Sequence, residues 1–181
     1  MDRLMPNFAF AMMSAMFKVR DFLSPRREVL EEAGLKPGFR VLDYGCGPGA
    51  YVVDAAEMVG ERGKVYALDI HPLAIKRLQN IAHKRRLANV ETICSNCRTG
   101  LPDNSVDVVL LYDVFHVLSD PDAVLAELHR VLKRNGTLSF SDHHMKEKDI
   151  ISGATDRKLF GLARKGERTY SFLKTASAVN P

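Results

Sequence analysis

The stretch that decides the fold is Val41–Ala50, which reads VLDYGCGPGA. Its small residues fit two patterns at once. Gly45, Gly47 and Ala50 match the dinucleotide fingerprint G-x-G-x-x-G/A, whereas residues 43–49 match D-x-G-x-G-x-G. Glycines let a ligand approach the backbone closely, and the N-terminus of a following helix offers free N–H groups to an anion. Either pattern therefore predicts a ligand-binding loop between a strand and a helix.

Outward from this loop, short apolar runs alternate with amphipathic segments, which predicts a parallel sheet with helices on both faces. Pro72 and Pro121 suit the first turns of two helices, and Asn135-Gly136 is expected to close the second. We expect strands at residues 40–43, 64–69, 90–94, 106–112 and 137–141, and helices at 25–33, 51–59, 71–87, 121–133 and 146–152.

The tail of the chain differs in pattern. Residues 159–166 and 167–174 read as two strands joined by Lys165-Gly166, which predicts an antiparallel hairpin. The expected fold class is therefore α/β, a three-layer Rossmann-like sandwich whose seven-stranded, mostly parallel sheet ends in an antiparallel hairpin. Residues 1–35 are expected to form a helical N-terminal extension, and residues 36–181 the ligand-binding domain, within one compact unit.

Two acidic residues refine the ligand. Asp69 ends the second predicted strand, 20 residues after Gly49, where a carboxylate accepts the ribose hydroxyls of an adenosine. Asp43 discriminates between adenosines, because a carboxylate beside a pyrophosphate is repelled, whereas beside an ammonium group it is attracted. Pro48 also removes an N–H that a pyrophosphate would use. The loop thus favours a cationic, amino-acid-bearing adenosine such as S-adenosylmethionine over NAD.

At this point VLDYGCGPG resembles the first motif of class I S-adenosylmethionine-dependent methyltransferases. VYALDIHP resembles their second-strand motif, and residues 100–140 resemble the fourth strand, its helix and the fifth strand of the ubiquinone/menaquinone-biosynthesis-type branch. The likeness covers about residues 36–175. It implies a cytoplasmic, S-adenosylmethionine-dependent methyltransferase with S-adenosylhomocysteine as product.

The resemblance also implies site residues. Those that would hold the methionine part and the loop, the ribose and the adenine are Asp43, Gly45, Cys46, Gly47, Gly49, Asp69 and Ile70. Cys46 is interpreted as a small packing residue, because nothing nearby in the sequence would activate its thiol.

The third strand departs from the family pattern. An acidic residue usually follows this strand and accepts a hydrogen bond from the adenine amino group; here Asn96 takes that place, or Ser95 with a shift of one residue. Cys97 is expected to pack beside the adenine. A zinc or redox interpretation of Cys94-x-x-Cys97 lacks further ligands unless the fold brings His143-His144 close, so no metal is expected.

Tyr112 to His116 follow the fourth strand, where the family places the reactive methyl group. Tyr112 is expected to contact the cofactor. His116 and Asp113 are the candidates for a catalytic group, since an imidazole titrates near neutral pH. Methyl transfer needs a general base only when the acceptor holds its proton at the working pH, and a structural role for His116 is the alternative.

Composition limits the other function classes. The 181 residues carry a net charge of +4 with 46% hydrophobic residues, which is ordinary for a globular chain and does not argue for nucleic acid. Three cysteines suit a reducing compartment. The longest apolar run, Phe8–Phe17, is too short to span a membrane.

The acceptor is expected to be a small molecule, because the tail hairpin leaves little room for an inserted substrate domain. Residues 12–17, rich in methionine, are expected to cover the site as a lid or simply to pack on the sheet. The competing functions are a non-catalytic S-adenosylmethionine-binding protein or partner subunit, an NAD-dependent oxidoreductase and, because of the cysteines, an arsenite methyltransferase. The sequence leaves the oligomeric state open.

Overall fold

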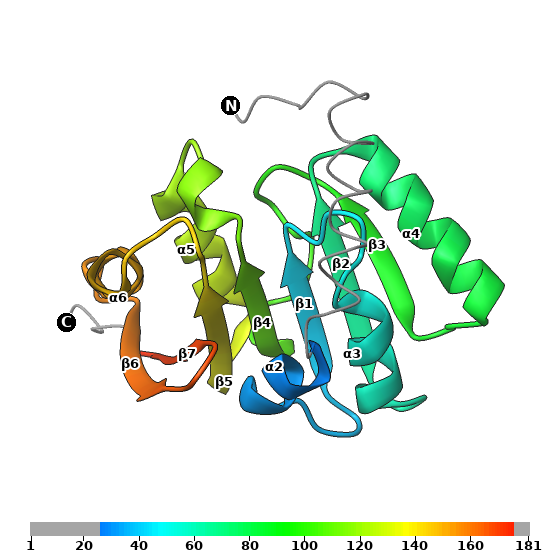
Figure 1. Cartoon of the computed structure of the whole chain (residues 1–181), viewed down its shortest axis with the longest axis horizontal. Coiled ribbons are helices and arrows are strands. Elements are labelled where there is room, and N and C mark those ends of the chain that lie inside the picture. The colour runs from blue at the N-terminus through cyan, green and yellow to red at the C-terminus, as the bar shows by residue number, and fades with distance from the viewer. Residues whose placement is uncertain (1–25, 176–181) are drawn as a thin grey trace.

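The computed structural model describes residues 26–175, which form a seven-stranded sheet in the order β3-β2-β1-β4-β5-β7-β6. All neighbouring strands from β3 to β5 pair in parallel, and β7 pairs antiparallel with both β5 and β6. Figure 1 shows the strands with the helices on both sides of them. The predicted fold class is confirmed. The elements are α2 (Arg26–Glu32), β1 (Arg40–Tyr44), α3 (Val52–Val59), β2 (Lys64–Asp69), α4 (Pro72–Arg85), β3 (Val90–Cys94), β4 (Val106–Tyr112), the 3-10 turn η1 (Phe115–Val117), α5 (Pro121–Val131), β5 (Leu132–Ser141), α6 (Glu147–Thr155), β6 (Phe160–Lys165) and β7 (Tyr170–Lys174).

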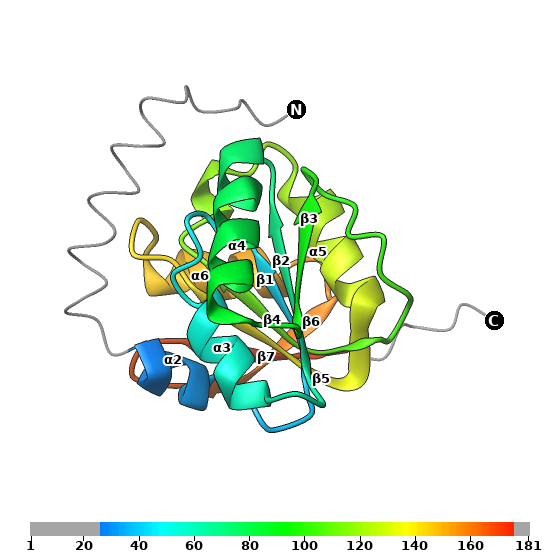
Figure 2. The ribbon, with the colours of Figure 1, turned by 90° about the vertical axis from the view of Figure 1, so that its right-hand side faces the viewer.

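The core lies in two layers, one on each face of the sheet. Side chains alternate between faces along a strand, so Val41 of β1 joins the layer under α2, α3 and α4, whereas Leu42 joins the layer under α5 and α6. Figure 2 shows α3 and α4 on one side of the sheet and α5 on the other. β4 is buried along almost its whole length, as expected for a central parallel strand covered on both faces.

The end of α5 differs from the sequence prediction. We expected the helix to continue to Lys133 and the strand to begin at Thr137, but α5 ends at Val131 and β5 begins at Leu132. Leu132 is fully buried and pairs with Val106, and the register then shifts before Val108 pairs with Thr137. The chain leaves the helix early because an extended backbone places the Leu132 side chain in the core. Asn135-Gly136 therefore lies within an irregular part of β5 rather than at the helix end.

The helix after β2 ends two residues earlier than predicted. It ends at Arg85, since Arg86 takes a left-handed backbone (φ 54°) and its N–H donates to the carbonyls of Ala82 and His83. Side chains cap the N-termini of α5 and α4. Asp120 accepts from the Ala123 N–H at 3.0 Å, and the His71 side chain accepts from the Leu73 N–H at 3.2 Å.

The tail hairpin is present, with its turn placed later than predicted. Lys165 is still in β6, and the turn spans residues 166–169, with the Gly166 N–H donating to the Thr169 carbonyl at 2.8 Å. The carboxylate of Glu32, from α2, lies in this turn and accepts from the Thr169 N–H at 2.7 Å and its hydroxyl at 2.8 Å. A long-range partner therefore sets the turn, which the local sequence does not reveal.

Part of the predicted N-terminal extension is described. Val29, Leu30, Ala33 and Leu35 belong to the same core layer as α3 and α4, so residues 26–35 are part of the domain core. The predicted lid, residues 12–17, lies outside the described residues.

Candidate functional site

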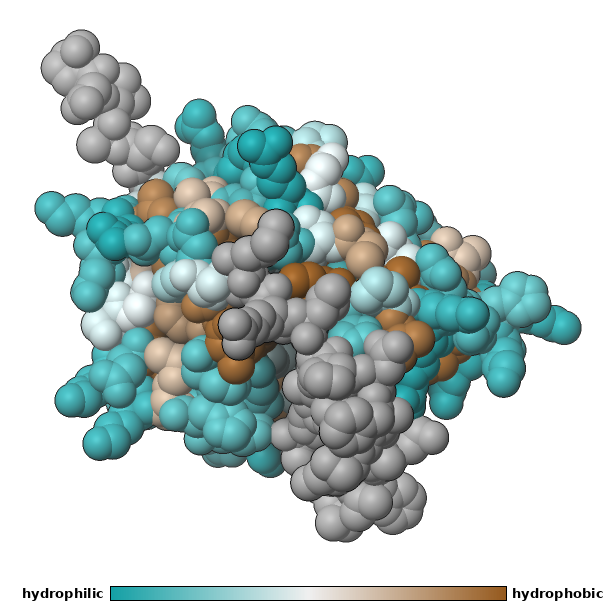
Figure 3. Space-filling model, turned by 90° about the horizontal axis from the view of Figure 1, so that it is seen from above, coloured by the Kyte–Doolittle hydropathy of each residue, from teal (hydrophilic) through white to brown (hydrophobic). Residues whose placement is uncertain are grey.

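A cavity of about 440 Å³ opens at the carboxyl ends of β1, β2, β3, β4 and β5. The strand order reverses between β1 and β4, and open α/β sheets place ligands at such a switch point. Seen from this end of the strands, hydrophobic residues show near the middle of the face and hydrophilic residues surround them (Figure 3). The loop singled out in the sequence forms one wall of the cavity, through Gly45, Cys46, Gly47 and Pro48.

The glycines of this loop have different tasks. Gly45 and Gly47 take left-handed backbones, with φ of 77° and 51°, and both line the cavity. A Cβ on Gly45 would lie 2.7 Å from a methyl carbon of Val114. Gly49 (φ 90°) does not line the cavity; a Cβ there would lie 2.3 Å from Leu78 on α4. The first two glycines therefore shape the ligand wall, and the third permits close packing of the loop on a helix.

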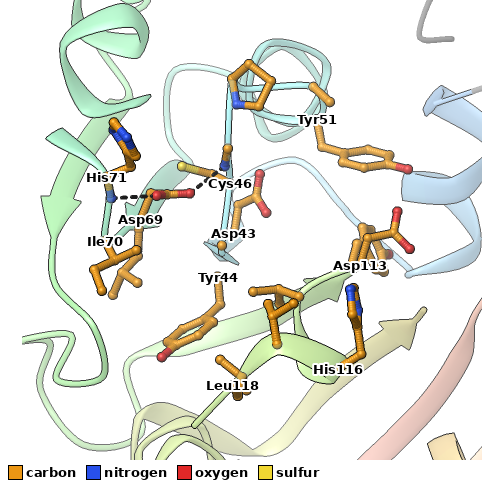
Figure 4. A pocket seen from close by; sticks show the side chains of 18 of the residues that line it. Asp43, Tyr44, Cys46, Tyr51, Asp69, Ile70, His71, Asp113, His116 and Leu118 are labelled. Carbon is orange, nitrogen blue, oxygen red and sulfur yellow. Dashed lines mark hydrogen bonds between the residues drawn. The ribbon is translucent and has the colours of Figure 1, made fainter. Parts of the chain in front are cut away.

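Asp69 is fixed by the backbone of two loops. Its Oδ2 accepts from the Gly47 N–H at 2.8 Å and its Oδ1 from the His71 N–H at 2.7 Å, as the dashed lines in Figure 4 show. Burial raises the pKa of Asp69, although these hydrogen bonds oppose the rise. The carboxylate is thus held at the end of β2 facing the cavity, and each oxygen keeps a second lone pair for a ligand hydroxyl.

Asp43 is the anomaly of the site. The residue is only 3% exposed, it lines the cavity, and among the described residues its Oδ2 has no hydrogen-bond partner. Burial, reinforced by the charge of Asp69, raises the pKa of Asp43 to about 7. A buried carboxyl oxygen without a donor is costly, so this position is suited to a donor or cation that a ligand brings. Burial also raises the pKa of the neighbouring Cys46 thiol, which therefore stays protonated.

The loops after β2 and β3 form the end of the cavity that lies away from His116 and Asp113. Ile70, Ser95 and Asn96 line it, and the Tyr44 hydroxyl donates to the Asn96 carbonyl at 3.1 Å. Tyr44 therefore ties the β3 loop to β1. Cys97 does not line the cavity and packs against the core layer under α5 instead, which leaves its predicted place beside a ligand without support.

Tyr112 and Tyr51 close the side of the cavity beside Asp43. Their rings meet edge to face with centroids 5.0 Å apart. The Tyr112 hydroxyl shares a 2.7 Å hydrogen bond with the Ser139 hydroxyl, and burial raises the pKa of Tyr112 above its usual range. Tyr112 is consequently a neutral, rigid wall, and Tyr51 is a site residue that sequence reasoning missed.

The two catalytic candidates lie together on the side of the cavity opposite Asp69 and Ile70 (Figure 4). Nδ1 of His116 is 2.8 Å from Oδ2 of Asp142, whose side chain has no exposed surface. Asp113 takes a left-handed backbone (φ 51°), and its Oδ1 lies 2.5 Å from Nδ1 of His143. The structure thus pairs each predicted candidate with a residue from the loop after β5.

Sequence reasoning missed Asp142, and it considered His143 and His144 only as metal ligands. The signal available was their position at the carboxyl end of the fifth strand, the same edge as the glycine loop. The His144 ring lies 4.3 Å from the ring of His116 and 5.1 Å from that of His143, measured between centroids. Within residues 26–175, no group of three or more His, Cys, Asp or Glu side chains is arranged to hold a metal ion.

Comparison with known proteins gives the family. A family model described as a methyltransferase domain matches residues 35–176. The chain belongs to this methyltransferase family. The resemblance noted in the sequence is therefore confirmed, and the glycine loop, Asp69 and the β4 loop belong to the matched region of a methyltransferase domain.

Relatives of this methyltransferase domain include proteins of quinone biosynthesis. The chain is 34% identical over 125 residues to a demethylmenaquinone methyltransferase of Geobacillus stearothermophilus, covering 68% of this chain and 53% of the relative. It is 27% identical over 165 residues to the ubiquinone/menaquinone biosynthesis C-methyltransferase UbiE of Shewanella piezotolerans, covering 86% of this chain and 66% of the relative. The chain thus spans less than two thirds of the length of these relatives.

One solved structure matches over its whole length. It is a SAM-dependent methyltransferase from Aquifex aeolicus, with a TM-score of 0.80 and 28% identity, and the match covers 94% of this chain and 100% of that one.

A search of the described residues finds no helix long and apolar enough to cross a membrane.

Proposed function

We propose that the protein transfers a methyl group from S-adenosylmethionine to a small-molecule acceptor. The observation that carries the proposal is the buried carboxyl group of Asp43 at the wall of a cavity inside a methyltransferase domain, because its Oδ2 has no hydrogen-bond partner within residues 26–175. S-adenosylmethionine carries an ammonium group, which is the chemistry that such a carboxylate stabilises. The name of the similar Aquifex aeolicus protein agrees with this cofactor.

The residues at the cavity fit the parts of that cofactor. Asp43 would hold the ammonium group, and the glycines Gly45 and Gly47 leave room for the methionine part along the backbone. Asp69 would accept the ribose hydroxyls, because its oxygens are already oriented by two backbone N–H groups. When bound, S-adenosylmethionine supplies a methyl group made electrophilic by the sulfonium.

The adenine end of the proposed site is the part with Ile70 and Asn96. The Asn96 side chain offers an amide oxygen in place of the usual carboxylate, and the Tyr44 hydroxyl fixes the loop that carries it. The acceptor would then enter between the loops after β4 and β5. Two of the relatives are named for quinone biosynthesis, which makes quinol rings the first acceptors to test. A cytoplasmic location remains part of this proposal.

Binding of S-adenosylhomocysteine to the Asp43→Asn variant tests the proposal. Asparagine keeps the shape of the side chain and removes its charge, so we expect affinity measured by calorimetry near pH 8 to fall at least about tenfold, the effect of about 1.4 kcal/mol. Asp122→Asn is the matched control, because Asp122 is an exposed residue paired with Arg157. Equal affinity of the Asp43 variant and the wild type would contradict the assignment.

A further inference from the structure

We propose that His116, oriented by Asp142, is the general base that removes a proton from the acceptor, and that the acceptor is a weakly acidic hydroxyl compound of the phenol type. This inference rests on the proposed methyl transfer and names the chemistry of its second substrate. His116 would touch the acceptor directly, and Asp142 would act through His116 as a positioning residue.

The geometry of the pair carries the inference. Oδ2 of Asp142 lies 2.8 Å from Nδ1 of His116 and also accepts the backbone N–H of His116 at 3.2 Å. Oδ1 of Asp142 accepts the N–H of His144 at 3.0 Å. Asp142 is therefore fixed from both sides, and the imidazole can rotate little without losing its hydrogen bond.

These contacts also fix the tautomer of His116. Burial opposes ionisation of Asp142, but the hydrogen bonds from the His116 side chain and backbone and from the His144 N–H outweigh it and lower the pKa of Asp142. An ionised carboxylate only accepts hydrogen bonds, so Nδ1 of His116 must carry the proton. The lone pair then lies on Nε2, which has no hydrogen-bond partner among the described residues. His116 lines the cavity, and its side chain is 27% exposed.

The groups around His116 suit a base that faces a flat apolar acceptor. The ring of His144 packs against it, and the neighbouring His143 is held by Asp113. Val117 and Leu118 line the same part of the cavity, and Val117 is 62% exposed. An apolar ring would cover such side chains, while its hydroxyl reaches the imidazole.

The proposed reaction moves one proton and one methyl group. The O–H bond of the acceptor breaks, and Nε2 of His116 takes the proton. An electron pair of the resulting phenolate forms the bond to the methyl carbon, from its oxygen or from a ring carbon. The carbon–sulfur bond breaks with its electron pair kept by sulfur, which leaves the neutral thioether of S-adenosylhomocysteine. After attack by a ring carbon, the C–H proton at that carbon goes to solvent and the oxygen takes its proton back from Nε2 of His116. After attack by the oxygen, Nε2 of His116 releases its proton to solvent.

The acceptor class follows from what such a base can do. A phenol holds its proton at neutral pH, with a pKa of about 10, so an imidazole base raises the reactive fraction. An aromatic thiol is largely ionised near pH 8 and gains little from a base. A dependence on His116 therefore separates the two kinds of acceptor.

The first experiment reads the tautomer and needs no turnover. The full chain, labelled with ¹⁵N-histidine, is saturated with S-adenosylhomocysteine, and the imidazole resonances are assigned with His116→Asn. We expect the neutral ring of His116 to carry its proton on Nδ1, and Asp142→Asn to shift the tautomer towards Nε2–H. A neutral His116 protonated on Nε2 in the wild type would overturn the proposal.

The second experiment compares a matched pair of probes, 4-methylphenol and 4-methylbenzenethiol, with methyl-labelled S-adenosylmethionine near pH 8. We expect His116→Asn to lower the rate on the phenol at least about 100-fold and the rate on the thiol less than about threefold. The remaining phenol rate should rise about tenfold per pH unit towards the phenol's own pKa. His83→Asn, on the last turn of α4, is the control and should leave both rates unchanged.

The outcomes separate this inference from the proposed function. If S-adenosylhomocysteine binds and the thiol is methylated, but the phenol rate does not depend on His116, the inference is wrong and the proposed function stands. If S-adenosylhomocysteine does not bind, the proposed function itself fails. If S-adenosylhomocysteine binds but the phenol is not methylated, the assignment of a phenol-type acceptor is wrong.

Discussion

At the scale of single residues, burial makes the ionised form of Asp43 unfavourable in the ligand-free fold. Burial raises its pKa from 3.8 to about 7, so the carboxyl group binds its proton more tightly in the folded chain than in the unfolded chain. The fold therefore loses stability as pH rises from about 4 to about 7. Such a residue in the wall of a cavity is typical of a binding site.

The Asp43→Asn variant should separate the loss of folding stability caused by this carboxyl group from its role in binding. Each tenfold change in proton affinity is about 1.4 kcal/mol, so we expect the ligand-free variant to gain about 2–3 kcal/mol relative to wild type between pH 5 and pH 8. Denaturant unfolding at both pH values measures the gain. Asp122→Asn should show no such pH dependence, and an Asp43 variant equally affected at both pH values would contradict the raised pKa.

At the scale of elements, α2 connects the two ends of the domain. Arg26 donates to the Ala50 carbonyl, at the end of the glycine loop, at 2.8 Å, while Glu32 holds the turn between β6 and β7. Burial disfavours ionised Glu32, but hydrogen bonds from Thr169 and Arg168 outweigh it and lower its pKa. The ionised carboxylate therefore stabilises the turn, and this contribution is lost as pH falls through its pKa.

Glu32→Ala should consequently destabilise the fold by about 1–3 kcal/mol, because the Thr169 N–H and hydroxyl lose their acceptor. Unfolding in urea near pH 7 measures this difference. Glu31→Ala is the matched control on the same helix, since Glu31 is exposed and makes an i,i+4 ion pair with Arg27. Such a pair contributes about 0.3–0.5 kcal/mol to stability. Equal losses in the two variants would show that the turn does not depend on Glu32.

At the scale of the whole molecule, the sequence predicts features that depend on one local segment, and it misses contacts between segments that the sheet brings together. The alternation of apolar runs and the loop around Gly45 predict the sheet and the cofactor wall, because both are local patterns. The pairing of His116 with Asp142 joins loops after β4 and β5, and Glu32 meets Thr169 across 137 positions. Such contacts depend on tertiary packing. The later start of the turn between β6 and β7 and the early end of α5 at Val131 have the same origin.

The sequence therefore predicts those site residues whose position depends on a single strand and the loop that follows it. Asp43 and Asp69 each follow from position at a strand end, and both line the cavity. Cys97 was placed by its neighbourhood in sequence; its partly buried side chain packs against the core layer under α5 and does not line the cavity. Tyr51 was missed because its role comes from the ring of Tyr112 against which it packs.

The central claim is that this cavity holds a cationic, amino-acid-bearing adenosine. Calorimetric titration of the full chain with S-adenosylhomocysteine and, separately, with NAD tests it most directly. S-adenosylhomocysteine keeps the ammonium group that Asp43 would meet, whereas NAD would bring a pyrophosphate towards a buried carboxylate. We predict saturable binding of S-adenosylhomocysteine, at least about 100-fold tighter than NAD, a difference of about 2.7 kcal/mol. Tight binding of NAD with none of S-adenosylhomocysteine would contradict the account.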